Sequence, residues 1–199
     1  MNYSIYAEST PNPEVMKFVS NRMLSDKSLE ILTASEGKDI PLVNELFKLP
    51  FVKSVFISSN FVSVTKTENI EWQTIALQLR IYIADYLNSI EIINHTESIS
   101  ITKIEESESE STSERKTEDK REFEGTEKEI ADLLDEYIRP AVEGDGGSIT
   151  LHSFKDGIVS VTLSGACNGC PSSTVTLKQG IEGLLKQKIG DKIKEVVAR

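Results

Sequence analysis

The stretch Gly157–Lys186 reads GIVSVTLSGACNGCPSSTVTLKQGIEGLLK and carries the clearest structural pattern of the chain. Its first part alternates apolar and polar residues, with Val159, Val161 and Leu163 on one side, which indicates a β-strand. Pro171 follows a glycine-containing loop, and proline is favoured at the first position of a helix. The apolar residues that should line the buried face of that helix are Leu177, Ile181, Leu184 and Leu185. We therefore expect a strand, a loop and a helix in direct succession.

The loop between these elements holds both cysteines of the chain, Cys167 and Cys170. Two cysteines at this spacing can bind one metal or cluster from the same side. Cys170 precedes Pro171, so we place it at or beside the helix N-terminus, where unpaired N–H groups and the helix dipole stabilise thiolate and anionic sulfur. Gly165 and Gly169 should leave the backbone room to approach a bulky ligand. The loop is rich in glycine and polar residues, and we expect it to be exposed.

The number of available ligands limits the kind of site. Structural zinc and iron–sulfur clusters usually take four protein ligands, whereas the chain has 2 cysteines and 2 histidines. His152 should face solvent, and His95 lies beside a polar segment. The simplest arrangement is therefore two chains that give two cysteines each, with the metal or cluster between them. Three interpretations stay open: an iron–sulfur cluster, a zinc shared by a dimer, and a thiol–disulfide oxidoreductase that cycles a Cys167–Cys170 disulfide.

The residues before this stretch predict a helix and a turn. Thr126 and Glu129 have the spacing of a capping box, and the helix that follows should end at Arg139-Pro140. Glu143–Gly147, with the sequence EGDGG, reads as a turn, in which Asp145 is expected to bond its own backbone.

A hairpin and a final strand complete this part of the chain. Ile149 and Leu151 alternate with polar residues, and Asp156-Gly157 should close a β-hairpin with the strand described first. The apolar residues of Ile193–Ala198 suggest a last strand. The predicted order is α-β-β-α, with a terminal β-strand.

The first part of the chain has a core pattern of its own and no cysteine. Short apolar runs bounded by turn residues predict strands, and apolar residues at three- and four-residue steps predict an amphipathic helix. The expected elements are strands near Ser4–Ala7 and Met16–Val19, a helix at Pro41–Leu49, a hairpin of Phe51–Ser58 and Phe61–Lys66 turning at Ser59-Asn60, and a helix over Trp72–Tyr86.

A polar segment separates the two patterns. In Glu105–Glu124, nineteen of twenty residues are Glu, Asp, Lys, Arg, Ser or Thr. Such a segment buries too little apolar surface to offset its ordering entropy. We predict two small α/β domains of the α+β type, at residues 1–94 and 126–199, joined by a disordered acidic linker at residues 95–125.

Composition excludes some classes of partner. The net charge of −10 argues against nucleic acid, which requires a surplus of Lys and Arg on one face. No apolar run approaches the ~18 residues that cross a bilayer, so we expect no membrane association. The start, MNYSIYAEST, lacks the basic and apolar regions of a secretory signal. We expect a cytoplasmic protein.

Three stretches resemble a known family. RPAVEGDGGSITLHSF (Arg139–Phe154) and Gly157–Lys186 closely resemble the C-terminal domain of NifU, the Nfu-type domain. The resemblance runs from Thr126 to the end and includes the DGG turn, the GACxGCPSS loop and the TLKxGIE helix in register. STPNPEVMKF (Ser9–Phe18) resembles the Nfu N-terminal domain.

The resemblance implies an iron–sulfur cluster scaffold or carrier, not an enzyme. It implies a homodimer that bridges a 4Fe–4S cluster through Cys167 and Cys170. Such a dimer would receive the cluster from upstream assembly proteins and pass it to apo iron–sulfur proteins, which the N-terminal domain would help to recognise. Two positions depart from the family pattern: Ser148 stands where Asp is frequent, and Gly190-Asp191 stands where Pro-Glu is frequent.

Overall fold

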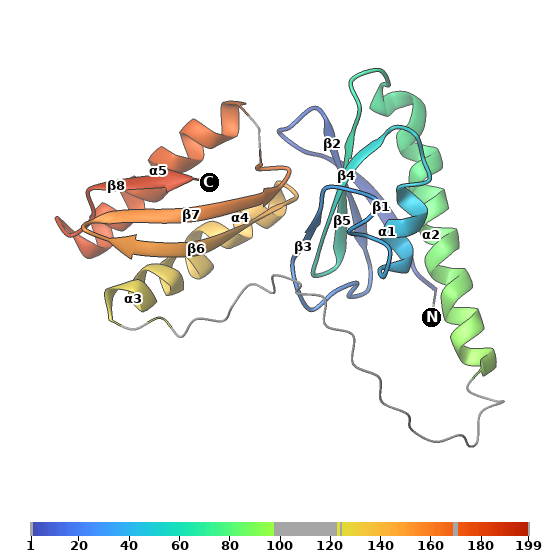
Figure 1. Cartoon of the computed structure of the whole chain (residues 1–199), viewed down its shortest axis with the longest axis horizontal. Helices are drawn as coiled ribbons and strands as arrows, with labels where there is room; N and C mark the ends of the chain where they lie inside the picture. Colours follow the sequence, from blue (N-terminus) through green and yellow to red (C-terminus); the bar gives the residue numbers. More distant parts are fainter. Residues whose placement is uncertain (1, 98–122, 124, 169–170, 199) are drawn as a thin grey trace.

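The computed structural model describes residues 2–97, 123, 125–168 and 171–198, and within these it describes 91–97 and 171–174 by their backbone only. These residues form two α+β domains, each with its own sheet and hydrophobic core, as predicted (Figure 1). Most of the predicted linker lies outside the described residues. Its disorder and the exact domain bounds stay predictions.

The N-terminal domain is built on a five-stranded antiparallel sheet in the order β1-β2-β5-β4-β3. Its strands are β1 (Ile5–Ser9), β2 (Val15–Ser20), β3 (Leu29–Ile31), β4 (Val52–Ser58) and β5 (Phe61–Lys66). Four of them were predicted, and the β4–β5 hairpin turns at Ser59, whose φ is +50°. The edge strand β3 was missed, because three residues are too few to establish an alternating pattern.

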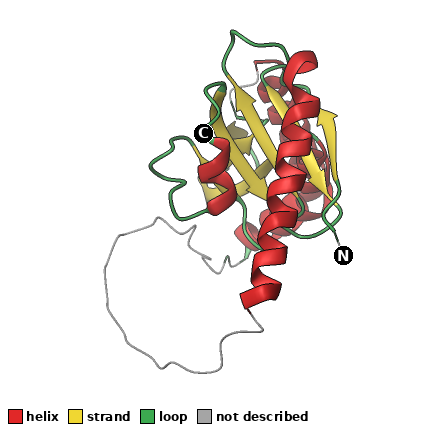
Figure 2. Cartoon of the chain, turned by 90° about the vertical axis from the view of Figure 1, so that its right-hand side faces the viewer, coloured by secondary structure: helices red, strands yellow, loops and turns green. Residues whose placement is uncertain are grey.

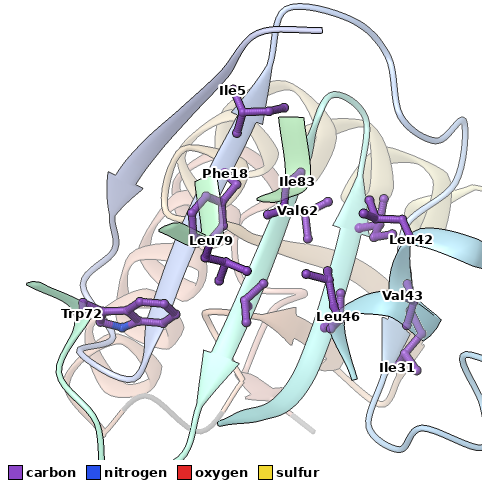
Figure 3. Close-up of a cluster of buried hydrophobic side chains, with 13 residues drawn as sticks. Ile5, Phe18, Ile31, Leu42, Val43, Leu46, Val62, Trp72, Leu79 and Ile83 are labelled. Atoms are coloured by element: carbon purple, nitrogen blue, oxygen red, sulfur yellow. The ribbon is translucent and has the colours of Figure 1, made fainter. Parts of the chain in front are cut away.

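Two helices, α1 (Pro41–Leu46) and α2 (Trp72–Glu97), pack with one face of this sheet, and the long helix α2 crosses it in Figure 2. As predicted, α1 begins at Pro41, but it ends at Leu46 instead of Leu49. The side chains between helices and sheet form the core drawn in Figure 3. Its fully buried members include Phe18, Val43, Leu46, Val62, Val64 and Ile83.

The C-terminal domain is built on a three-stranded sheet in the order β6-β7-β8. The strands β6 (Gly147–Lys155) and β7 (Ile158–Gly165) form the predicted antiparallel hairpin. Its turn has φ of +53° at Asp156 and +86° at Gly157, and a type I′ turn requires positive φ at both positions. The predicted last strand is β8 (Glu195–Ala198), which pairs in parallel with β7.

The helical segment before this sheet differs from the prediction. It does not end at Pro140, but runs from α3 (Thr126–Leu133) through a π-helical turn (Leu134–Ile138) into α4 (Arg139–Gly144). The amide of Arg139 donates to the carbonyl of Leu134, five residues back. A π-turn shifts the hydrogen-bond ladder just before Pro140, which has no N–H of its own, so the chain stays helical past the proline.

The predicted capping box is also wrong. The N-cap of α3 is Gly125, and no side chain caps the helix. Glu127, two residues before Glu129, instead accepts a hydrogen bond from the amide of Phe154 in β6 at 2.9 Å. The carboxylate therefore anchors the helix to the sheet, and its position in the first turn also suits the positive end of the helix dipole.

The predicted second helix is α5 (Pro171–Ile189), which begins at Pro171. Ile181 and Leu185 of α5 are fully buried, whereas Leu177 and Leu184 are only partly buried. Ile181 and Leu185, with Leu177 packed against them, share a core with Ile130, Leu134, Ile149, Val159, Val161 and Val196. Within the described ranges, no helix is both long and apolar enough to span a bilayer.

Glu182 ties α5 to the last strand, which leads to a pH-dependent prediction. Its carboxylate accepts from Lys186 at 2.6 Å and from the amide of Val196 at 3.2 Å, and these bonds lower the pKa of Glu182. A carboxylate whose pKa is lower in the folded than in the unfolded state stabilises the fold at pH values above its unfolded pKa. This stabilisation is lost as the pH falls through the folded pKa. Glu182→Gln should therefore destabilise the domain at pH 7 but not in acid below that lowered pKa.

Urea unfolding, followed through the amide signals of β7 and β8 at both pH values, measures this difference. Glu136→Gln, at an exposed position within the continuous helical segment and outside its first turn, is the control and should leave stability unchanged at either pH. A Glu182→Gln deficit of the same size at both pH values would contradict the account.

Candidate functional site

Cys167 lies in the loop that leaves β7 and enters α5. Its side chain is only 3% exposed and packs within the core cluster of the C-terminal domain. The neighbouring Ala166 is also 3% exposed, whereas Asn168 is exposed. The amide of Asn168 donates to the carbonyl of Gly165 at 3.0 Å, which closes a turn around Cys167. The prediction of an exposed loop is therefore wrong for Ala166 and Cys167.

The position of the Cys167 side chain depends on Gly147 at the start of β6. A Cβ added at Gly147 would lie 2.8 Å from the Cys167 Sγ and 2.6 Å from the carbonyl oxygen of Ser164. Gly147 pairs directly with Gly165 across the hairpin. The absence of a side chain at residue 147 thus lets the thiol approach the backbone of β6.

The turn before β6 is joined to the cysteine loop by backbone bonding. The carbonyl of Gly146 accepts from the amide of Ala166 at 3.1 Å, and Gly146 has a φ of +81° that only glycine adopts readily. Asp145 ends α4 with an exposed side chain, and its amide donates to the carbonyl of Ala141 at 3.0 Å. Asp145 therefore belongs to the turn, and the DGG turn supports the loop that holds Cys167.

The other predicted site residues are placed less completely. Cys170 and Gly169 lie outside the described residues, although α5 begins directly after them at Pro171. His152 is exposed on β6, as predicted. Over the ranges with described structure, no group of three or more His, Cys, Asp or Glu side chains could hold a metal ion.

One row of side chains from the N-terminal domain reaches the cysteine loop, which the sequence analysis did not anticipate. Paired residues of the five strands place Glu8, Lys17, Ser63, Phe56 and Glu30 side by side across the sheet. We call these five residues the cross-strand row. They alternate with core residues such as Phe18 and Val62, so they lie on the face away from α2.

The cross-strand row binds the end of α4 and the DGG turn that follows it through two hydrogen bonds. Ser63 Oγ donates to the carbonyl of Gly146 at 2.7 Å, and Lys17 Nζ donates to the carbonyl of Gly144 at 3.2 Å. Lys17 is 8% exposed, lies 4.8 Å from the centroid of the Phe61 ring, and pairs with Glu8 at 3.5 Å. A buried lysine is thus held by a carboxylate, a ring and a carbonyl together.

The same row binds the cysteine loop. Glu30 Oε1 accepts from the amide of Gly165 at 3.0 Å and from Asn168 Nδ2 at 3.3 Å. The Phe56 ring lies where a Cβ on Gly165 would come within 2.8 Å of it. Asn12 adds a bond from Nδ2 to the carbonyl of Ala166 at 3.2 Å.

These contacts revise the expectation for Gly165. Its missing side chain was expected to leave room for a ligand, but that room holds the ring of Phe56. The stretch STPNPEVMKF contains two of the contacting residues, Asn12 and Lys17. The sequence held one usable sign of this interface, a lysine between apolar residues of a predicted strand. A buried lysine needs a hydrogen-bond or charge partner, so its position indicated a polar contact on that face.

The chain matches two family models. "Scaffold protein Nfu/NifU N terminal" matches residues 5–90, and "NifU-like domain" matches residues 130–197. The cysteine loop and the DGG turn fall within the second match, whereas the cross-strand row falls within the first.

Curated relatives extend over both matches. The human protein "NFU1 iron-sulfur cluster scaffold homolog, mitochondrial" is 33% identical over 184 residues, which cover 92% of this chain and 66% of the human one. The protein of the same name from Drosophila ananassae is 33% identical over 187 residues, or 93% of this chain and 60% of the relative. The chain thus spans slightly less than two thirds of the length of these relatives. The solution structure of a NifU-like protein from Saccharomyces cerevisiae, 23% identical, covers 42% of this chain and 77% of its own with a TM-score of 0.38.

The packing of Cys167 on Gly147 predicts that Gly147→Ala destabilises the C-terminal domain. The added methyl would overlap the Cys167 Sγ and the Ser164 carbonyl, and overpacking of this kind costs about 1–3 kcal/mol. Gly144→Ala is the matched control, because a Cβ there meets nothing within 4 Å. Urea unfolding followed through β6 and β7 measures both variants, and equal stabilities of the two would contradict the packing argument.

Proposed function

Because the chain belongs to the Nfu/NifU family of scaffold proteins, we propose that it is an iron–sulfur cluster scaffold that carries a 4Fe–4S cluster between two copies of itself. The observation that carries the proposal is the cysteine loop: the only two cysteines of the chain stand between β7 and α5, inside the NifU-like match. The cluster is cargo that the protein passes on.

The ligand count supports sharing between two chains. Iron–sulfur clusters are usually held by four thiolates, and one chain supplies Cys167 and Cys170 alone. Two chains related by a twofold axis supply four. Each cysteine loop then holds one half of the cluster, and separating the chains opens the site.

Local structure supports the choice of anionic sulfur as the ligand. α5 begins at Pro171, directly after Cys170, and a helix N-terminus stabilises negative charge with its free N–H groups and its dipole. Thiolate is the form of cysteine that binds iron, so this environment favours the ligating form.

Transfer is proposed as an exchange of thiolates. A thiol of the recipient loses its proton and binds an iron, and the displaced thiolate of Cys167 or Cys170 takes up a proton. Four such exchanges move the cluster without any change in its charge or oxidation state. Transfer runs from the scaffold to the recipient because the recipient offers four ligands within one chain. The scaffold offers four ligands only while two chains stay together.

The recipients are proposed to be apo iron–sulfur proteins, and the donors are proposed to be cluster assembly proteins. The N-terminal domain is proposed to help choose among recipients. The cytoplasmic location remains a prediction, and the relatives named above are described as mitochondrial.

Anaerobic reconstitution with iron and sulfide tests the proposal. The loaded protein should show a broad absorption near ~400 nm, as expected for thiolate-bound iron. Cys167→Ser or Cys170→Ser should lose more than about 90% of this absorption, because each removes two of the four ligands of the dimer. Far-ultraviolet circular dichroism checks that the variants stay folded.

The matched control is Ser164→Ala, which changes a hydroxyl residue on the same strand end and leaves both thiols in place. It should load fully. Full loading of either cysteine variant would refute the ligand assignment, and a colourless protein that retains zinc after the same treatment would favour the zinc-bridged dimer.

A further inference from the structure

The face of the N-terminal sheet that carries the cross-strand row is buried although much of it is polar. Lys17 is 8% exposed and Ser63 is 1% exposed, and the aromatic Phe56 is 2% exposed. Helices α1 and α2 pack with the core on the opposite face (Figure 2), so they do not account for this burial. Figure 1 shows the turn before β6 and the end of β7 directed at this face.

The contacts are concentrated on the two segments that hold Cys167 in place. Among the described residues, these hydrogen bonds between the domains end on Gly144 at the end of α4, on Gly146 of the DGG turn, or on the loop from Gly165 to Asn168. Three different strands, β2, β3 and β5, and the segment before β2 contribute to these hydrogen bonds. Within the described residues, the N-terminal domain therefore contacts the backbone of the cysteine loop and of the turn beside it, together with the Asn168 side chain.

We propose that the cross-strand row, with Asn12, is a docking surface for the cysteine loop of the same chain, which caps the loop in the cluster-free protein and must release it before two copies share a cluster. This inference rests on the proposed function. Iron–sulfur bonds are short, comparable to the ~2.3 Å of a zinc–thiolate bond, so a shared cluster brings two cysteine loops together. A domain docked on each loop occupies the space that the second copy requires.

Charge couples release to loading. Glu30 places its carboxylate on the amide of Gly165 and on Asn168, the residue after Cys167. Four thiolates give a bound cluster a net negative charge, and the nearby carboxylate of Glu30 repels like charge, although water at this exposed position weakens the repulsion. Binding of a cluster therefore disfavours the docked state. In the cluster-free chain, an uncharged thiol does not repel the Glu30 carboxylate.

The interaction has the strength of a reversible contact. A net gain of about 1 kcal/mol for a typical hydrogen bond makes a small interface weak in isolation. A coil of roughly 30 residues, the length predicted for the linker, has an end-to-end distance of about 30 Å and keeps two tethered partners at an effective concentration in the millimolar range. At this effective concentration the N-terminal domain occupies the cysteine loop for much of the time, although the interface is weak. A second copy of the chain can still compete with it for the loop.

Amide hydrogen exchange in the cluster-free, full-length chain tests the docking. The amide of Gly165 bonds across the domains to Glu30, whereas the adjacent amide of Ala166 bonds within its own domain to Gly146. Ser63→Asp sets a carboxylate against the Gly146 carbonyl, and it should speed exchange at Gly165 at least fivefold while Ala166 changes less. Thr65→Asp, on the same face of β5 but one row further along, is the control and should leave both amides unchanged.

Glu30→Ala is a second variant at an exposed edge-strand position, where the fold of the domain is not at risk. It should also speed exchange at Gly165 at least fivefold. Unchanged Gly165 exchange in Glu30→Ala, or in a folded Ser63→Asp, would overturn the docking surface.

The rate of cluster loading tests the release step. Ser63→Asp and Glu30→Ala should load from iron and sulfide at least twofold faster than the unaltered chain and Thr65→Asp. Faster Gly165 exchange with an unchanged loading rate would overturn the link between docking and loading. Absence of a cluster from all four proteins would refute the proposed function and the release step with it, whereas the exchange data would still decide whether the domains dock.

Discussion

The contact between the Cys167 thiol and the backbone of Gly147 fixes the geometry on which the site depends. It requires the DGG turn and the cysteine loop to lie against each other, which the bond from the Ala166 amide to Gly146 maintains. The two segments together form the end of the C-terminal domain that the N-terminal domain covers. A side chain at residue 147 would therefore disturb the thiol, the turn and the docking surface at once.

The regular elements were predictable because local patterns decide them. Asp156-Gly157 specifies a hairpin turn, and Pro171 specifies a helix start, so both were correctly placed. Pro140 was misread as a helix end, since a π-turn in the preceding residues lets the chain continue. Such a turn depends on packing against the sheet, which a single sequence does not display.

The site was predictable in its residues and not in its surroundings. Cys167 and Cys170 stand out because they are the only cysteines, and their spacing suits a shared ligand. The burial of Cys167 was missed because it depends on packing against Gly147 of another strand. The cover over its loop was missed because it depends on residues more than 100 positions away in the chain, Glu30 and Asn12. The alternating pattern of β2 and β5 indicated which residues lie on the same side of the sheet. It did not indicate which part of the chain covers that side.

Sharing of one cluster by two chains is the central claim, and native mass spectrometry of the anaerobically loaded, full-length protein tests it most directly. The account predicts a species of two chains with four irons and four sulfides, together with cluster-free single chains. A single chain that retains the complete cluster would contradict it.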